Sequence, residues 1–205
     1  MMDYNGVEIE RICHSAFKFK NKSFVVYIDP YEIKQGSEIA DVIIITHDHF
    51  DHCSPNDVAK IKGTKTIIVT VKSAASKLSG TIRTVIPGDK INANGIDIEA
   101  VAAYNVGKKF HPHENKWIGV IIKIGDVRIY HAGDTDLIPE MDKINCDVAL
   151  LPVSGTYVMN PDEAIKAASK IKANVFVPMH YGKIVGTKED AKKFCNGIEK
   201  KCFIL

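Results

Sequence analysis

Short apolar runs bounded by turn-forming residues recur along the whole chain and predict a protein rich in β-strands. Two of these runs, Val148–Val153 and Asn174–Met179, are continuously apolar, as expected for strands covered on both faces. Turn residues at Asn21-Lys22 and Gly125-Asp126 separate neighbouring runs and predict two hairpins. The predicted strands span residues 7–12, 16–20, 23–28, 42–46, 66–70, 84–86, 96–104, 117–124, 127–131, 148–153 and 174–179.

Helix start signals lie between several of these strands. Ser54-Pro55 supplies an N-cap followed by a proline at the first helical position, and Asn160-Pro161 repeats this arrangement. Thr187, with an acid three residues later, predicts a third start. The predicted helices span residues 54–61, 71–78, 160–171 and 187–198.

The order of these elements predicts the architecture. Antiparallel strands come first, strands alternating with helices follow, and the same sequence of elements then occurs a second time. In each half an apolar strand ends at a histidine, His47 in the first and His180 in the second. An αββα sandwich, in which two mixed β-sheets pack face to face with helices on the outside, satisfies this order. We therefore expect residues 1–205 to form a single domain built from two similar halves.

Composition narrows the class of protein. With 27 basic and 25 acidic residues among 205, the net charge of +2 gives no electrostatic case for nucleic acid or a membrane surface. No apolar run is long enough to cross a membrane, and the N-terminus lacks a signal peptide, so we expect a cytoplasmic protein. Five cysteines without C-x-x-C spacing predict reduced thiols, and Cys53 is expected to be structural.

The densest group of chemical side chains is the run Thr46-His47-Asp48-His49-Phe50-Asp51-His52, directly after an apolar strand. Imidazoles and carboxylates crowded at the end of a buried strand are costly to desolvate unless a cation holds them. The ligand types suit zinc or iron better than magnesium or calcium. If the strand continues, His47 and His49 point the same way and Asp48 points away. Asp51 and His52 can then reach a second position nearby.

The spacing H-x-H-x-D-H resembles the metal-binding motif of the metallo-β-lactamase superfamily at every ligand position. The resemblance implies that His47 and His49 bind one metal ion, whereas Asp51 and His52 bind a second. It also implies the αββα sandwich, with the site at one edge between the sheets. The similarity runs from about Asp29 to Tyr181. It looks closest to the small branch that includes ascorbate-6-phosphate lactonase and N-acyl phosphatidylethanolamine phospholipase D.

Further ligands follow from the same resemblance. Asp134, in the segment Gly133-Asp134-Thr135 after a strand, matches the aspartate that bridges both metals. His180 matches the last histidine of the second metal. Asp29-Pro30 resembles the first short motif, whose aspartate supports the site by hydrogen bonding, although a simple strand-ending turn explains it equally well.

The third histidine of the first metal is the place where the chain departs from the pattern. Asn105 stands where a histidine is common, and two histidines, His111 and His113, follow in a long loop. We expect the loop to fold back so that His111 fills this position, with His113 and Asn105 as alternatives.

The predicted function is metal-dependent hydrolysis of a small-molecule ester, lactone or phosphoester. The expected cofactor is two divalent ions, zinc first, with iron or manganese as alternatives. A hydroxide bridging two ions is nucleophilic near neutral pH, because coordination lowers the pKa of water from about 15.7 to about 7. Asp51 could relay a proton, and the predicted catalytic residues are Asp51, Asp134 and His180.

Other functions remain open from the sequence. A nuclease or phosphodiesterase acting on nucleic acid, a redox di-iron protein and a non-catalytic metal-binding protein would all use related ligands. His113, Tyr157 and Tyr181 are candidates to contact a substrate. A homo-oligomer is compatible with the sequence, which does not identify the substrate.

Overall fold

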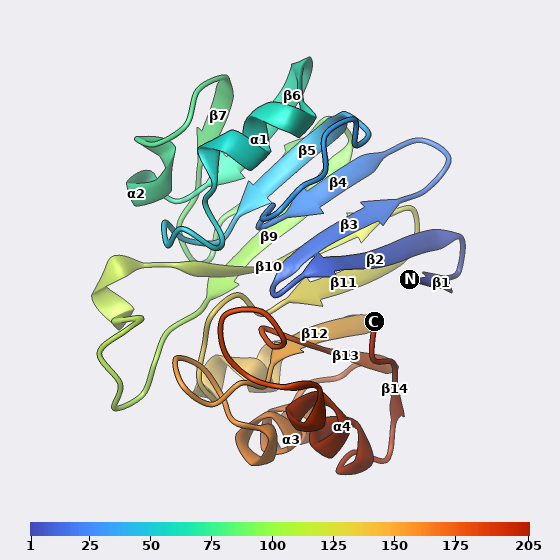
Figure 1. The fold of residues 1–205 in the computed structure, drawn as a ribbon, viewed down its shortest axis with the longest axis vertical. Coiled ribbons are helices and arrows are strands. Elements are labelled where there is room, and N and C mark those ends of the chain that lie inside the picture. The colour runs from blue at the N-terminus through green and yellow to red at the C-terminus, as the bar shows by residue number, and fades with distance from the viewer.

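The computed structural model describes all 205 residues, which form two seven-stranded sheets packed face to face (Figure 1). One continuous cluster of buried apolar side chains, rich in isoleucine and valine, fills the space between and around the sheets. The predicted αββα sandwich of two mixed sheets is confirmed.

The first sheet comes from the N-terminal part of the chain, with its strands side by side in sequence order. Strands β1 to β4 pair antiparallel, and strands β4 to β7 pair parallel. The strands are β1 (Met2–Tyr4), β2 (Val7–Cys13), β3 (Ala16–Lys20), β4 (Val25–Ile28), β5 (Ala40–Ile45), β6 (Lys62–Thr70) and β7 (Thr81–Thr84).

The second sheet repeats this plan with the rest of the chain. Strands β8 to β11 pair antiparallel, and strands β11 to β14 pair parallel. The strands are β8 (Lys90–Ala93), β9 (Ile96–Ala102), β10 (Ile118–Ile124), β11 (Val127–His131), β12 (Val148–Pro152), β13 (Val175–Met179) and β14 (Lys201–Cys202). The carboxyl ends of β5 and β13, where His47 and His180 follow, meet at the site described below.

The helices lie outside the two sheets (Figure 1), with α1 and α2 beside β5 to β7 and α3 and α4 beside β12 and β13. Helix α3 begins at a complete capping box made by Asn160 and Glu163, and Thr187 with Asp190 makes another for α4. The helices are α1 (Pro55–Ile61), α2 (Lys72–Ala75), α3 (Pro161–Lys170) and α4 (Lys188–Asn196), with 3-10 turns η1 (His113–Asn115) and η2 (Pro139–Lys143). None is long and apolar enough to cross a membrane.

The strands that the prediction missed or misplaced are those at the four sheet edges, and the interior strand β6 begins four residues earlier than predicted. The sequence pattern missed β1, β8 and β14, and it placed β7 at residues 84–86. Edge strands are short and partly exposed, so they lack the apolar run that marks an interior strand. β7, for example, has no buried residue. Helix α2 is also shorter than the predicted 71–78.

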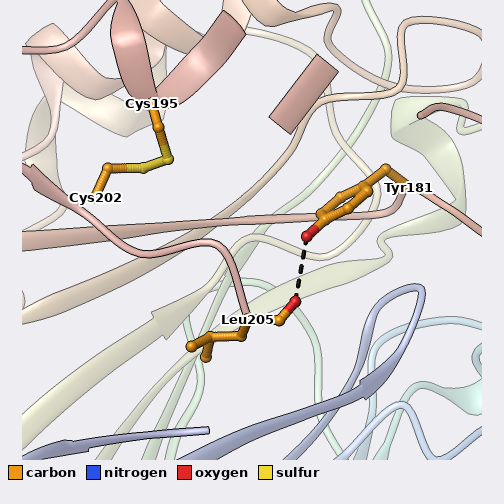
Figure 2. The surroundings of a disulfide bond; sticks show 4 residues. All are labelled: Tyr181, Cys195, Cys202 and Leu205. Atoms are coloured by element: carbon orange, nitrogen blue, oxygen red, sulfur yellow. Dashed lines mark hydrogen bonds between the residues drawn. A yellow bond between two sulfur atoms is a disulfide. The ribbon is translucent and has the colours of Figure 1, made fainter. Parts of the chain in front are cut away.

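The expectation of free thiols is wrong for two of the five cysteines. Cys195 at the end of α4 and Cys202 in β14 form a disulfide, with their Cα atoms 5.3 Å apart (Figure 2). The spacing of the two residues did not indicate this pairing, because the unpredicted strand β14 brings them together. Nearby, the Tyr181 hydroxyl donates a hydrogen bond to the Leu205 carbonyl at 3.3 Å (Figure 2). Cys13, Cys53 and Cys146 are free, as expected.

Candidate metal centre

The segment after β5 forms a tight turn rather than a continued strand. The amide groups of His52 and Cys53 both donate to the His49 carbonyl, so the chain reverses within the motif. The prediction that His47 and His49 point the same way rested on a continued strand, and the strand ends before His47. Their rings nevertheless converge, with His47 Nε2 lying 3.1 Å from His49 Nδ1. The turn also brings Asp51 and His52 to the same place, with His52 Nε2 3.5 Å from an Asp51 oxygen.

Two other residues of the segment lie away from this group. Asp48 pairs with Lys77 at 2.9 Å on the outer side, in agreement with its predicted orientation. Cys53 is buried, and burial raises the pKa of its thiol to about 11. A thiol with a raised pKa is unreactive at neutral pH, which agrees with the structural role expected for Cys53.

Asp134 lies at the centre of the site. Its carboxylate oxygens are 3.0 Å from His180 Nε2, 3.2 Å from His111 Nε2 and 3.3 Å from His52 Nε2. The preceding Gly133 has a φ of +64°, and a Cβ there would lie 2.6 Å from the Ile118 carbonyl oxygen. Only glycine fits this close approach of two strands, and it fixes where Asp134 enters the site.

The long loop after β9 supplies His111 and turns His113 away. His111 is buried against Asp134, whereas His113 begins the 3-10 turn η1 and packs on Tyr104 with ring centroids 4.5 Å apart. Asn105 does not point into the site as a ligand. Its side-chain oxygen instead accepts a hydrogen bond from the His111 amide and lies 3.0 Å from His111 Nδ1. Of the three candidates, the structure brings His111 to the site.

Two residues that are not predicted ligands orient the histidines. Asp29, at the end of β4 and with a φ of +49°, lies 2.7 Å from His52 Nδ1 and accepts hydrogen bonds from Thr46. Ser154 Oγ lies 2.9 Å from His180 Nδ1. Each contact leaves the Nε2 atom of the ring facing Asp134, which is how outer contacts fix imidazoles for metal binding. The contact between Asp29 and His52 agrees with the supporting role that the sequence resemblance implies for Asp29.

The donor atoms fit metal ions. Ligands bound at about 2.1 Å to one ion lie about 3 to 3.4 Å apart, and the contacts to Asp134 fall in or near this range. Buried donors without a hydrogen-bond partner include Nε2 of His52, Nε2 of His111 and one Asp134 oxygen. Such orphaned groups are costly in a protein interior unless a ligand satisfies them. Three sets of donors each lie within 4.8 Å of one another: His47, His49 and His111; His14, Asp51 and His180; and His47, His52 and Asp134.

Most of these groups also have the protonation state that binds metal. Burial lowers the pKa of His47 well below its usual value, and burial likewise lowers that of His49, so both rings are neutral. Burial opposes the charge on Asp134, but His180 and His52 hold its pKa well below the usual range. His52 differs, because Asp134 and Asp29 raise its pKa against the effect of burial. A cation beside Asp134 would remove the main cause of that rise.

Comparisons with known proteins place the chain in a family. Residues 8–180 match the family model described as a beta-lactamase superfamily domain. A UPF0173 metal-dependent hydrolase from Thermoplasma acidophilum is 33% identical over 196 residues, which covers 88% of this chain and 86% of the relative. The chain belongs to the metallo-β-lactamase superfamily. It is a metal-dependent hydrolase of that superfamily, as the sequence predicted.

Solved structures of similar proteins agree with the fold. A structure from Parabacteroides distasonis, named as a metal-dependent hydrolase, is 28% identical with a TM-score of 0.87, covering 97% of this chain and 92% of that one. Igni18, a metallo hydrolase from Ignicoccus hospitalis, is 24% identical with a TM-score of 0.76, covering 97% and 94%. Because Igni18 is less than 25% identical to this chain, its similarity shows only that the two proteins share a fold.

The sequence interpretation missed one residue beside the candidate site and included two that lie elsewhere. His14, in the turn between β2 and β3, is fully buried, and its Nε2 lies 3.4 Å from an Asp51 oxygen. No motif marked it, and the only signal was a histidine between two predicted strands. Tyr181 packs under Arg11 and bonds Leu205 rather than facing the site, and His113 lies away from it. Tyr157 does line the site cavity.

Proposed function

We propose that this protein binds two divalent metal ions and hydrolyses a small ester or lactone. The observation that carries the proposal is the central position of Asp134 between two groups of donors. His47, His49 and His111 would hold the first ion. Asp51, His52 and His180 would hold the second, and Asp134 would contact both. Zinc is the first expectation for the ions, with iron or manganese as alternatives.

When bound, such ions lower the pKa of water to near neutrality and polarise the substrate oxygen as Lewis acids. The chain's own residues hold the donors in place and keep them ionised or neutral as required. Burial opposes the negative charge of Asp51, yet contacts with His14 and His52 hold its pKa well below the usual range. Asp51 is therefore a carboxylate at neutral pH, which suits a metal ligand, whereas its lowered pKa makes it a weak proton acceptor.

The shape and lining of the cavity support a small, partly apolar substrate. The cavity has a volume of about 240 Å³, and its lining includes the donors His49, Asp51, His111, Asp134 and His180. The rest of the lining is the apolar or aromatic side chains Phe50, Phe110, Tyr157 and Ile184. Phe110 and Tyr157 stack edge to face, with ring centroids 4.7 Å apart. A cavity of this size accommodates a metabolite rather than a polymer chain.

Charge around the cavity favours a carboxylic ester or lactone over a phosphoester. No lysine or arginine lines it. In the loop that carries Phe110 and His111, Lys108 is paired with Asp136 at 2.6 Å. A phosphate group would meet no cation among the residues that line the cavity, and the +2 net charge gives no electrostatic case for a nucleic acid backbone.

Elemental analysis followed by a substrate panel tests this proposal. We expect close to two transition ions per chain, and turnover of nitrophenyl esters and lactones at least tenfold above that of a nitrophenyl phosphodiester. Phe110→Ala should lower kcat/KM for an apolar ester by about tenfold, because it removes part of an apolar wall. Phe203→Ala is a matched control, since Phe203 is similarly exposed but does not line the cavity.

Three results would contradict parts of this proposal. Metal content that stays at trace level after reconstitution would exclude the metal centre. Full metal loading without turnover of any ester, lactone or phosphodiester would favour the non-catalytic alternative. Preference for phosphodiesters by tenfold or more would overturn the substrate class.

A further inference from the structure

His14 is a buried histidine that the predicted ligand set leaves out. It lies in the turn between β2 and β3, is fully buried, and adopts a φ of +48°. Non-glycine residues in this left-handed region are uncommon and are often held there by functional constraints. His180, on the other sheet, has the same conformation, with a φ of +58°.

The backbone holds these two histidines together. The His180 amide donates a hydrogen bond to the His14 carbonyl at 3.0 Å, and this bond connects the two sheets. Arg11 Nε donates to the same carbonyl at 3.0 Å. The His14 and His180 rings consequently lie side by side, with centroids 3.9 Å apart. The position of His14 relative to the site is thus fixed by the fold and does not depend on a flexible loop.

A purely structural role does not account for the ring. Both ring nitrogens of His14 are buried without a hydrogen-bond partner, and the Asp51 carboxylate lies 3.4 Å from Nε2. His131 provides the contrast inside the same molecule. It is equally buried, but its Nε2 donates to the Ser15 carbonyl and its Nδ1 accepts from the Gly133 amide. Buried polar groups in folded proteins are nearly always paired, so the unpaired Nε2 of His14, which lies beside the Asp51 carboxylate, points to a missing ligand.

The geometry points to His14 as an additional ligand of the second metal ion, through Nε2. This atom lies 3.4 Å from an Asp51 oxygen, the separation expected for two atoms bound to one ion. One donor each from His14, Asp51 and His180 lie within 4.8 Å of one another. The inference rests on the proposed function, since it assigns a further ligand to the metal centre proposed there.

The additional ligand makes the two metal positions unequal. The second ion would have His14, Asp51, His52, His180 and Asp134, whereas the first would have three histidines and Asp134. Zinc in protein sites is usually four-coordinate, so the first set suits zinc. A set of five nitrogen and oxygen donors suits an ion that accepts more ligands, such as manganese or iron. We therefore infer that the two positions prefer different metals.

A variant pair tests the ligand directly. His14→Asn shortens the side chain, and asparagine tolerates positive φ, so the turn is kept. We expect it to weaken the second metal ion by tenfold or more and to leave the first unchanged, measured by chelator competition and elemental analysis. With zinc and manganese supplied together, the variant should also bind less manganese than the wild type. His113→Asn makes the same change at a histidine outside the site and should bind metals like the wild type.

Wild-type protein loaded with cadmium-113 supplies a second readout that needs no variant. Each of two cadmium signals should couple to three imidazoles, those of His47, His49 and His111 for one and those of His14, His52 and His180 for the other. A second cadmium coupled to only two imidazoles would overturn the inference even if His14→Asn failed to fold. So would His14→Asn protein that keeps both ions with unchanged affinity. Failure of the proposed function looks different, since the wild type itself would then bind no metal or hydrolyse nothing.

Discussion

The two donor groups of the site are built in different ways. The first cluster, His47, His49 and His111, takes two members from one tight turn and the third from a long loop. The second cluster, His14, Asp51 and His180, takes each member from a different element. His14 and His180 lie in left-handed backbone conformations, and the backbone bond between them joins the two sheets. The first cluster thus joins one turn of the first sheet to one loop of the second, whereas the second cluster is held by a backbone hydrogen bond between the sheets.

The clusters also differ in charge. The first contains imidazoles only, and burial keeps His47 and His49 neutral. The second contains the Asp51 carboxylate, whose charge His14 and His52 stabilise against burial. Asp134 lies between them and supplies a second carboxylate. Substitutions that affect one cluster and spare the other therefore test whether the site works as two positions with one shared ligand.

The largest effect is expected from Asp134→Ala, which removes the ligand shared by both clusters. We expect the affinity for both ions to fall by about a hundredfold or more, because the surrounding imidazoles lose their common anionic partner. His49→Ala should mainly empty the first position. Asp126→Ala, in an exposed hairpin turn, controls for loss of a carboxylate. Equal and complete loss of both ions in His49→Ala with the fold intact would contradict the two-position assignment.

His111→Ala should have the next largest effect and should be confined to the first cluster. The variant loses a ring that contacts Asp134 directly at 3.2 Å, so we expect the first ion to weaken at least severalfold. His113→Ala should leave the affinity for metal unchanged, because that side chain packs on Tyr104 outside the site. Chelator competition on both variants measures this difference. The reversed pattern would assign the ligand to His113.

Asp29→Asn should affect the second cluster more gently. Asp29 lies 2.7 Å from His52 Nδ1 and binds no metal itself in this arrangement. Loss of such a supporting carboxylate typically lowers metal affinity about 10- to 100-fold. We expect this loss for the second ion only, with the first close to its wild-type affinity by the same titration. An equal loss at both positions would mean that Asp29 supports the fold of the site as a whole.

The smallest effect is expected from Tyr181→Phe, next to His180 in sequence. The hydroxyl bonds the Leu205 carbonyl and faces away from the cavity, so its removal should cost about 1 kcal/mol of unfolding free energy. Metal affinity and kcat/KM should both stay at the wild-type level, which thermal unfolding and the ester assay measure together. A drop in turnover without a change in stability would restore Tyr181 as a substrate contact.

The sequence predicted much of the first cluster and less of the second for a physical reason. His47 and His49 lie within one short motif, and the apolar strand before them marks where the motif sits. His14 lies in a turn that no sequence motif marks, and the hydrogen bond from the His180 amide to its carbonyl holds it at the site. No local pattern encodes that contact, because it depends on the packing of sheets formed by distant parts of the chain.

The strands were likewise predicted more accurately inside the sheets than at their edges. Interior strands such as β5 and β13 were predicted near their observed positions, because a strand covered on both faces must be continuously apolar. The edge strands β8 and β14 have few buried residues and gave no pattern. The disulfide between Cys195 and Cys202 was missed together with β14, since the strand sets their proximity.

The loop after β9 has a consequence for how this enzyme could evolve. It carries the cavity wall residue Phe110 and the proposed ligand His111 at adjacent positions. Mutations that reshape substrate preference through this loop therefore risk displacing a metal ion at the same time. Ile184 also lines the cavity but is less closely coupled, because it lies four residues after the proposed ligand His180 rather than next to it. New specificities should arise more readily through the segment around Ile184, with the His111 loop changing later.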